Sequence, residues 1–137
     1  MLDAKTIAAK LEEAGVQATA QRIAIYQYIV CEADHPTAEE IKDWADQNFP
    51  KMSLATVYNT LNILVAAGLL KDYRFPNMSK VIYDSNVVHH HHFLDDETGQ
   101  LIDIDPDVVE VTSKLKKEFH ISQIQILFRG TRQTVRK

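Results

Sequence analysis

Apolar residues in the first half of the chain recur every three or four positions, which is the spacing of helices that bury one face. Residue types that commonly cap helices precede these runs: Asp3, Thr19, Thr37 and Ser53. The segment Thr37-Ala38-Glu39-Glu40 also fits a capping box, because its threonine is followed three residues later by an acid. The pattern predicts helices over residues 4–14, 20–32, 38–48 and 54–67.

The helix expected after Ser53 has two chemically different faces. Its apolar stripe consists of Leu54, Val57, Leu61, Leu64 and Val65. The opposite face carries small and hydrogen-bonding side chains, with Tyr58 on its flank: Ala55, Thr56, Asn59, Asn62 and Ala66. Such side chains suit a helix that enters a DNA major groove. A polar face that meets only solvent is the alternative that this pattern leaves open.

Two short runs with strand character follow this helix, over residues 69–75 and 80–83. Helices closed by such a hairpin form a winged helix-turn-helix, in which the polar-faced helix reads DNA and the hairpin is the wing. Lys71, Arg74 and Lys80 would bring positive charge to this wing, where DNA phosphates lie. Ordinary solvated surface residues are the alternative for each of them.

The second half of the chain has a different pattern, in which strands dominate. The expected elements are strands over residues 89–94, 100–104 and 121–128, and one helix over 105–118. The fold class is therefore α+β, with a helical first half and a small mixed second half. So few elements give a thin core, and pairing with a second copy of the chain would enlarge it.

Composition narrows the class of protein. The 137 residues contain no apolar run long enough to cross a bilayer, and the N-terminal residues lack the apolar core of a signal peptide. We therefore expect a cytoplasmic protein without a membrane partner. The single cysteine, Cys31, excludes an intramolecular disulfide and a multi-cysteine zinc site within one chain. The net charge of −4 means that any DNA-binding surface must be a local basic patch.

Four consecutive histidines, residues 89–92, carry the strongest chemical signal. In a strand, His90 and His92 share one face and His89 and His91 share the other. The returning strand would bring Asp103 beside one of these pairs. Two imidazoles with carboxylates form a nitrogen and oxygen ligand set that suits Fe(II), Mn(II) or Zn(II). The alternative is a solvated strand edge.

Several segments together resemble the ferric-uptake-regulator family over nearly the whole chain. They are Thr19-Ala20-Gln21-Arg22, Asp34-His35-Pro36-Thr37-Ala38-Glu39-Glu40-Ile41, Ser53-Leu54-Ala55-Thr56-Val57-Tyr58-Asn59-Thr60-Leu61, Gly68-Leu69, His90-x-His92 and Gly99-Gln100-Leu101-Ile102-Asp103. The combination of the Ser-Leu-Ala-Thr-Val-Tyr segment with the downstream His-x-His is much more specific than a helix-turn-helix alone.

The resemblance implies a transcriptional repressor that binds palindromic operator DNA as a homodimer when it holds a regulatory metal. It implies a winged-helix DNA-binding domain over residues 1–83, a hinge over 84–88, and a dimerisation and metal-sensing domain over 89–137. The implied metal ligands are His35, Asp84, His90, His92 and Asp103. Candidate DNA contacts are Arg22, Lys51, Ser53, Thr56, Tyr58 and Asn59.

The peroxide-sensing branch of the family is similar to this chain in having an aspartate at position 103, where iron-uptake repressors commonly have glutamate. The resemblance to that branch implies that bound Fe(II) reacts with peroxide and that a coordinating histidine, His35 or His90, is oxidised. Iron is then lost, the dimer opens and DNA is released. Mn(II) would keep the repressor insensitive. An iron-responsive repressor of the ferric-uptake type is the alternative.

The chain also departs from the family pattern. Many relatives carry two Cys-x-x-Cys pairs that bind structural zinc, and the first pair maps here to Asp95 and Thr98. A structural four-cysteine zinc site is therefore not expected, and strand pairing with apolar packing should hold the dimer. A candidate second metal site comprises His89, His91 and Glu110.

An enzyme is a competing interpretation of the histidines. His90, His92 and Asp103 match the two-histidine, one-carboxylate arrangement of non-haem iron oxygenases. Such enzymes need a substrate cavity in a larger barrel, for which a chain half filled by a winged helix leaves little room. A metal-carrying protein would leave the helix that bears Tyr58 unexplained. We therefore expect a regulator and no catalytic turnover.

Overall fold

A computed structural model describes residues 2–76 and 78–133 and confirms the α+β class. The chain forms two compact units that divide after Val87. This division falls within residues 84–88, the predicted hinge, whose role stays a prediction. No helix in the described ranges has both the length and the apolar character that a bilayer crossing requires.

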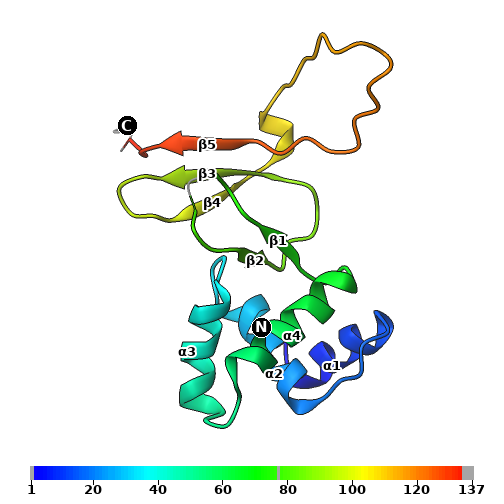
Figure 1. Ribbon diagram of the computed structural model, residues 1–137, viewed down its shortest axis with the longest axis vertical. Coiled ribbons are helices and arrows are strands. Elements are labelled where there is room, and N and C mark those ends of the chain that lie inside the picture. Colours follow the sequence, from blue (N-terminus) through cyan, green and yellow to red (C-terminus); the bar gives the residue numbers. More distant parts are fainter. Residues whose placement is uncertain (1, 77, 134–137) are drawn as a thin grey trace. The chain divides into compact units, whose positions relative to one another are not determined.

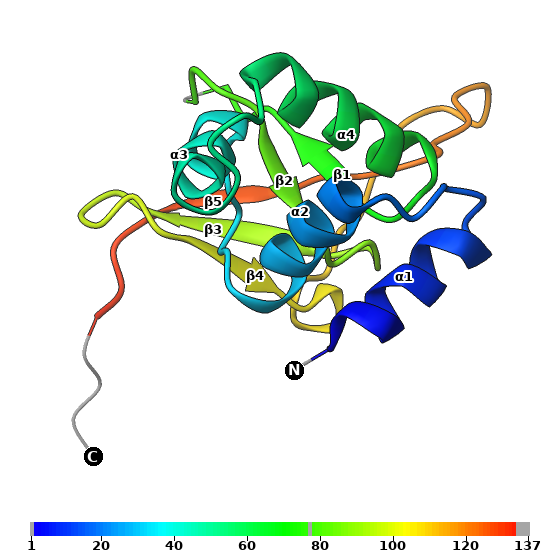
Figure 2. The same ribbon diagram turned by 90° about the horizontal axis from the view of Figure 1, so that it is seen from below.

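The first unit contains the predicted helices: α1 (Ala4–Glu13), α2 (Ala20–Cys31), α3 (Ala38–Asn48) and α4 (Leu54–Ala66) (Figure 2). The four capping predictions are confirmed, because the side chains of Asp3, Thr19, Thr37 and Ser53 each accept a hydrogen bond from the backbone N–H three residues later. Helix α1 packs against α2, and α3 packs against α4. Their shared core is fully buried at positions such as Leu11, Ile25, Ile41 and Leu61.

Helix α4 separates an apolar face from a polar face, as predicted. Val57, Leu61 and Leu64 are fully buried, and the small and amide side chains of the opposite face are largely exposed. The prediction was wrong for Leu54, which is 38% exposed. Leu54 fits the apolar spacing, but it is the first residue of the helix, and the core does not cover that end. Thr60 is buried instead, within the same stripe.

The predicted wing is an antiparallel hairpin of β1 (Lys71–Tyr73) and β2 (Ile82–Asp84). Both strands are shorter than predicted. Strand β1 begins only at Lys71, because Leu69 still takes part in the C-terminal end of α4. Gly68 has a φ of 78°, and the N–H of Leu69 donates to the carbonyl of Leu64. This is a helix end that glycine favours. Asn77, in the predicted turn, lies outside the described residues.

Strand β2 also pairs with the residues that precede α3. The N–H of Tyr83 donates to the carbonyl of Pro36 over 2.9 Å, and Thr37 forms an antiparallel bridge with Ile82. In this antiparallel register, the position opposite His35 is Asp84. Backbone pairing therefore determines that two residues far apart in the sequence meet.

The second unit is a sheet with the strand order β4-β3-β5 (Figure 1). Strands β3 (His91–Asp95) and β4 (Leu101–Ile104) form an antiparallel hairpin, and β5 (Leu127–Gly130) runs parallel to β3. In the turn of the hairpin, Asp95 Oδ1 accepts from the N–H of Glu97 over 2.9 Å. Gly99 in the same turn has a φ of 74°, a conformation that glycine adopts without strain.

The predicted helix over 105–118 was wrong: only a 3₁₀ helix, Pro106–Val108, forms there. Asp105 caps it as predicted, accepting from the N–H of Asp107 over 2.8 Å. Residues 109–126 form a long loop without helix or strand (Figure 1). The β-branched residues at the start of this segment lower its helix propensity, and a helix in water is stabilised mainly by packing of its apolar face.

The last strand begins later than the predicted 121–128. Only Leu127–Gly130 pair with β3, because β3 itself offers a short edge. Arg129 then donates to Asp96 Oδ1 over 2.9 Å, which joins β5 to the hairpin turn. Arg132 lies 4.0 Å from Asp95 Oδ2. The positions to which the family's first cysteine pair maps thus lie in a turn that is held by carboxylates and arginines.

Candidate functional site

His35 and Asp84 form the first candidate group of ligands, in the helical unit. His35 Nε2 lies 3.3 Å from Asp84 Oδ2, and both side chains are about nine-tenths buried. The other ring nitrogen, Nδ1, lies 2.7 Å from Asp34 Oδ1. Asp84 Oδ1 accepts from the N–H of Asn86 over 2.9 Å. His35 has a φ of 45°, a left-handed conformation that is uncommon for residues other than glycine and carries backbone strain.

One tautomer of His35 suits a bound cation. If Nδ1–H of His35 donates to Asp34, the lone pair lies on Nε2 and faces the carboxylate of Asp84. Two electron-rich atoms in this position attract a metal ion or a proton between them. Adjacent ligands of an ion that is bound at about 2.1 Å lie roughly 3 Å apart, close to the spacing of this pair.

Asp34 should therefore increase metal affinity without contacting the metal. A carboxylate that accepts from the second nitrogen of a ligating histidine orients the ring, and its loss typically lowers affinity about 10–100-fold. We expect Asp34→Ala to weaken Mn(II) binding within this range in isothermal titration calorimetry. Asp43→Ala, which removes an exposed carboxylate of α3, is the matched control. Equal affinities of the two variants would contradict the orienting role of Asp34.

His90, His92 and Asp103 form the second candidate group, in the sheet unit. Asp103 lies opposite His92 in the register of β3 and β4. Its Oδ1 is 3.3 Å from His90 Nε2 and 3.6 Å from His92 Nε2. The two ring centroids are 4.5 Å apart, as predicted, although the strand begins at His91 and not at residue 89 as expected. His90 Nδ1 lies 2.7 Å from the carbonyl of Val88, which fixes this ring with Nε2 toward the carboxylate.

The other two histidines lie together on the opposite face. The rings of His89 and His91 have centroids 5.0 Å apart. Nδ1 of His91 is buried without a hydrogen-bond partner, and burial, followed by the neighbouring histidines, lowers the pKa of this residue. Glu110 is exposed in the long loop and belongs to no cluster of three close ligand atoms within the described residues. The second metal site stays a prediction.

The candidate DNA contacts lie on or beside α4, except for Arg22, which is in the first turn of α2. Lys51 and Asn59 are exposed. Ser53 caps α4 through its hydroxyl, which accepts from the N–H of Thr56 over 3.1 Å. Arg22 Nη1 donates to the carbonyl of Gln17 over 3.0 Å. The hydroxyl of Tyr58 donates to Glu39 Oε1 over 3.0 Å.

Sequence reasoning missed three partners of the candidate residues: Asp34, Glu39 and the carbonyl of Val88. Asp34 precedes His35 directly, and that adjacency was the available signal. Glu39 appeared only as part of a capping box, and nothing in the sequence connects it to Tyr58. The contact of His90 with Val88 uses a backbone carbonyl, so no side chain in the sequence signals it.

The fold and these residues define a class of protein: a winged helix-turn-helix unit joined to a small three-stranded sheet unit, with histidine and carboxylate candidate ligands in both. The model of the ferric uptake regulator family matches residues 13–129, and the chain belongs to this family.

Individual members of this family are similar to the chain in sequence and in structure. The peroxide-responsive repressor PerR of Staphylococcus aureus is 36% identical over 95 residues, which are 69% of this chain and 64% of that protein's length. The crystal structure of the Vibrio cholerae ferric uptake regulator is similar with a TM-score of 0.69 and 26% identity, over 90% of this chain and 98% of the other. PerR from Streptococcus pyogenes, solved as a basis for peroxide sensing and gene regulation, is 30% identical with a TM-score of 0.55, over 95% and 91%.

Proposed function

We propose that this protein is a cytoplasmic, metal-dependent transcriptional repressor that binds palindromic operator DNA as a homodimer and is inactivated by peroxide through iron-catalysed histidine oxidation. The observation that carries this proposal is the position of Asp103 Oδ1, which faces Nε2 of both His90 and His92. Membership of the ferric uptake regulator family supports regulation, and a peroxide-responsive relative supports the stimulus.

The regulatory ion would be held by His35, Asp84, His90, His92 and Asp103 together. Neither group alone fills the five or six positions that Fe(II) or Mn(II) prefers, since the first offers two ligands and the second three. We infer that both groups bind one ion, so that its presence determines the angle between the DNA-binding and dimerisation domains. The nitrogen and oxygen donors suit Fe(II) or Mn(II), and they also accept Zn(II) in the purified protein.

When bound, Fe(II) would reduce hydrogen peroxide, and the oxidant formed would attack a neighbouring group. The protein determines which groups are neighbours. His35 and His90 each have Nδ1 anchored, to Asp34 and to the carbonyl of Val88 respectively. The ring carbon between the two nitrogens is bonded to Nε2, so it lies beside any ion that Nε2 holds. These two histidines are therefore the proposed oxidation targets.

DNA would be read by the exposed face of α4, with Thr56, Tyr58 and Asn59 toward the groove. Ser53 would act mainly by capping this helix, and Lys51 and Arg22 would contact phosphates. A dimer presents two such helices, so a palindromic site follows from its symmetry. Because the net charge of the chain is −4, this contact needs a local basic surface, which we propose to lie around α4 and the wing.

The homodimer would form through the second unit, where large apolar side chains are exposed. Those that follow β4 are Val108, Val111, Leu115, Phe119, Ile121, Ile124 and Phe128. Exposed apolar groups of this number mark interaction sites. The first four follow helical spacing, so we propose that this segment folds as a helix when a second copy covers it.

An iron-responsive repressor is the second candidate, because it would use the same ligands. One assay separates the two: DNA retardation on promoter fragments with Mn(II), with Fe(II), and with Fe(II) followed by hydrogen peroxide. We expect retardation in the first two conditions, its loss in the third, and a mass increase of one oxygen on a peptide that contains His35 or His90. Retardation in all three conditions would remove peroxide sensing and leave the iron-responsive function. Turnover of an organic substrate would instead favour the enzyme.

A further inference from the structure

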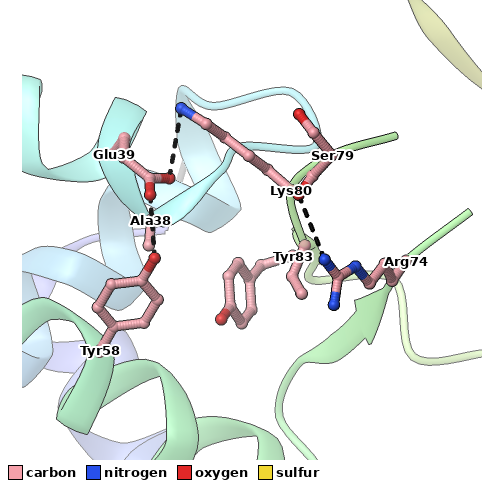
Figure 3. A pocket seen from close by; sticks show the side chains of 8 residues that line it. Ala38, Glu39, Tyr58, Arg74, Ser79, Lys80 and Tyr83 are labelled. Carbon is pink, nitrogen blue, oxygen red and sulfur yellow. Dashed lines mark hydrogen bonds and ion pairs between the residues drawn. The ribbon is translucent and has the colours of Figure 1, made fainter. Parts of the chain in front are cut away.

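A cavity of about 220 Å³ lies between the first turn of α3, the flank of α4 and the residues that precede β2. Most of the residues that line it are polar or charged: Glu39, Tyr58, Arg74, Ser79, Lys80 and Tyr83 (Figure 3). Tyr58 belongs to the proposed DNA-reading helix, and Arg74 and Lys80 belong to the wing. The cavity therefore lies where the two elements proposed to meet DNA come together within one unit.

The carboxylate of Glu39 contacts two of the donors of this cavity, Tyr58 and Lys80. Its Oε1 accepts from the hydroxyl of Tyr58 over 3.0 Å, and its Oε2 lies 3.9 Å from Lys80 Nζ (Figure 3). The guanidinium of Arg74 donates to the carbonyl of Ser79 over 3.5 Å at the same cavity. The backbone N–H of Glu39 and then the Tyr58 hydroxyl lower the pKa of this carboxyl, which is therefore ionised at neutral pH.

A hydroxyl and an ammonium that converge on one anionic oxygen pair are also the donors that DNA phosphates receive from proteins. A phosphodiester has the same single negative charge and accepts the same hydrogen bonds as a carboxylate. We propose that this cavity binds a DNA backbone phosphate, and that Glu39 competes with that phosphate for Tyr58 and Lys80. The inference rests on the proposed DNA-binding function and adds that an acidic residue, Glu39, weakens the binding of DNA.

The exposure of these side chains permits the exchange. The side chains of Glu39 and Lys80 are 39% and 55% exposed, so each can turn toward solvent without opening the core. A phosphate and the carboxylate would repel each other if both faced the same two donors. DNA binding must therefore displace Glu39, and the affinity that is measured includes the loss of its contacts.

Replacing Glu39 with glutamine tests this competition, because the amide keeps the shape of the side chain and removes its charge. The full chain with saturating Mn(II) would be titrated with a fluorescent duplex of random sequence, since phosphate contacts do not depend on sequence. We expect Glu39→Gln to bind roughly five- to tenfold more tightly, the effect of removing one nearby like charge. The plot of log affinity against log salt should become steeper by about one phosphate contact.

Glu40→Gln is the matched control, because it removes the same charge one residue away in the same helix turn. Successive residues of a helix point in directions about 100° apart, and Glu40 is not among the residues that line the cavity. We expect this variant to change the affinity less than about twofold, because exposed charges at a distance are screened by salt. An equal gain in affinity in both variants would show that only the net charge matters, and it would overturn the phosphate site.

Adding Tyr58→Phe to Glu39→Gln should remove most of the gain, because the phosphate then loses its hydroxyl donor. Unchanged or weaker binding by Glu39→Gln alone would overturn the competition and show that the carboxylate supports Tyr58. If neither the original chain nor any variant binds duplex DNA with Mn(II), the proposed DNA-binding function is rejected, and the phosphate site is rejected with it. Binding by the original chain without a gain in Glu39→Gln rejects the phosphate site alone.

Discussion

Replacing His92 with alanine should lower Mn(II) affinity by more than about 100-fold, because losing a ligand costs more than the roughly 10–100-fold that losing a ligand's hydrogen-bond partner costs. The side chain of His92 is 2% exposed and its Nε2 lies 3.6 Å from Asp103 Oδ1. Metal-dependent DNA retardation should disappear in the same variant, since the ion is proposed to set the geometry of the DNA-binding domains. Calorimetric titration and a gel-shift series would measure both quantities on one preparation.

His120→Ala controls for the removal of an imidazole, because His120 is exposed in the long loop of the same unit. It should leave both Mn(II) affinity and DNA retardation unchanged. The informative failure would be a His92 variant that loses metal but still binds DNA as the original chain does. Metal would then be bound without controlling the DNA-binding surface.

Introducing a charge into the exposed apolar segment should dissociate the dimer. Leu115 is 59% exposed in the single chain. Burying a leucine contributes about 1.5–3 kcal/mol, and a symmetric dimer contains each position twice. Leu115→Asp should therefore weaken dimerisation by roughly 3–6 kcal/mol, about two to four orders of magnitude in the dissociation constant. Sedimentation equilibrium over a concentration series would measure the change.

Ser113→Asp introduces the same charge two residues away, at a position outside the apolar stripe. It should dimerise with nearly the original affinity, apart from weak repulsion between exposed charges. Dimers of equal stability in both variants would show that residues 109–126 do not form the interface. The dimer would then have to use another surface, and the coupled folding of this segment would be rejected.

Local signals in the sequence predicted the helical unit well. Thr19 and Ser53 cap their helices as expected, because an N-cap needs only a side-chain oxygen and a backbone N–H three residues away. The pairing of His89 with His91 and of His90 with His92 was predicted from side-chain alternation, and it holds although only His91 and His92 lie in the strand. Such features depend on neighbours in the chain, which a single sequence displays directly.

The remaining features depend on partners that a single sequence does not display. A helix was predicted over 105–118, but in the single chain the apolar side chains of this segment, such as Val108 and Leu115, are exposed instead of packed. His35 was predicted as a candidate ligand, whereas its positive φ and its contact with Asp34 depend on how the loop before α3 pairs with β2. Likewise, Glu39 reaches Tyr58 only because α3 packs on α4.

The parallel pairing of β5 with β3 also determines the order in which the sheet unit can assemble. Hairpin β3–β4 closes over a short turn, whereas β5 joins β3 only after residues 105–126 have closed a much longer loop. Longer loops lose more conformational entropy on closure, and contacts distant in sequence form slowly. Strand β5 should therefore dock last, and a nascent or proteolytically nicked chain would display the hairpin with one edge of β3 still open to other strands.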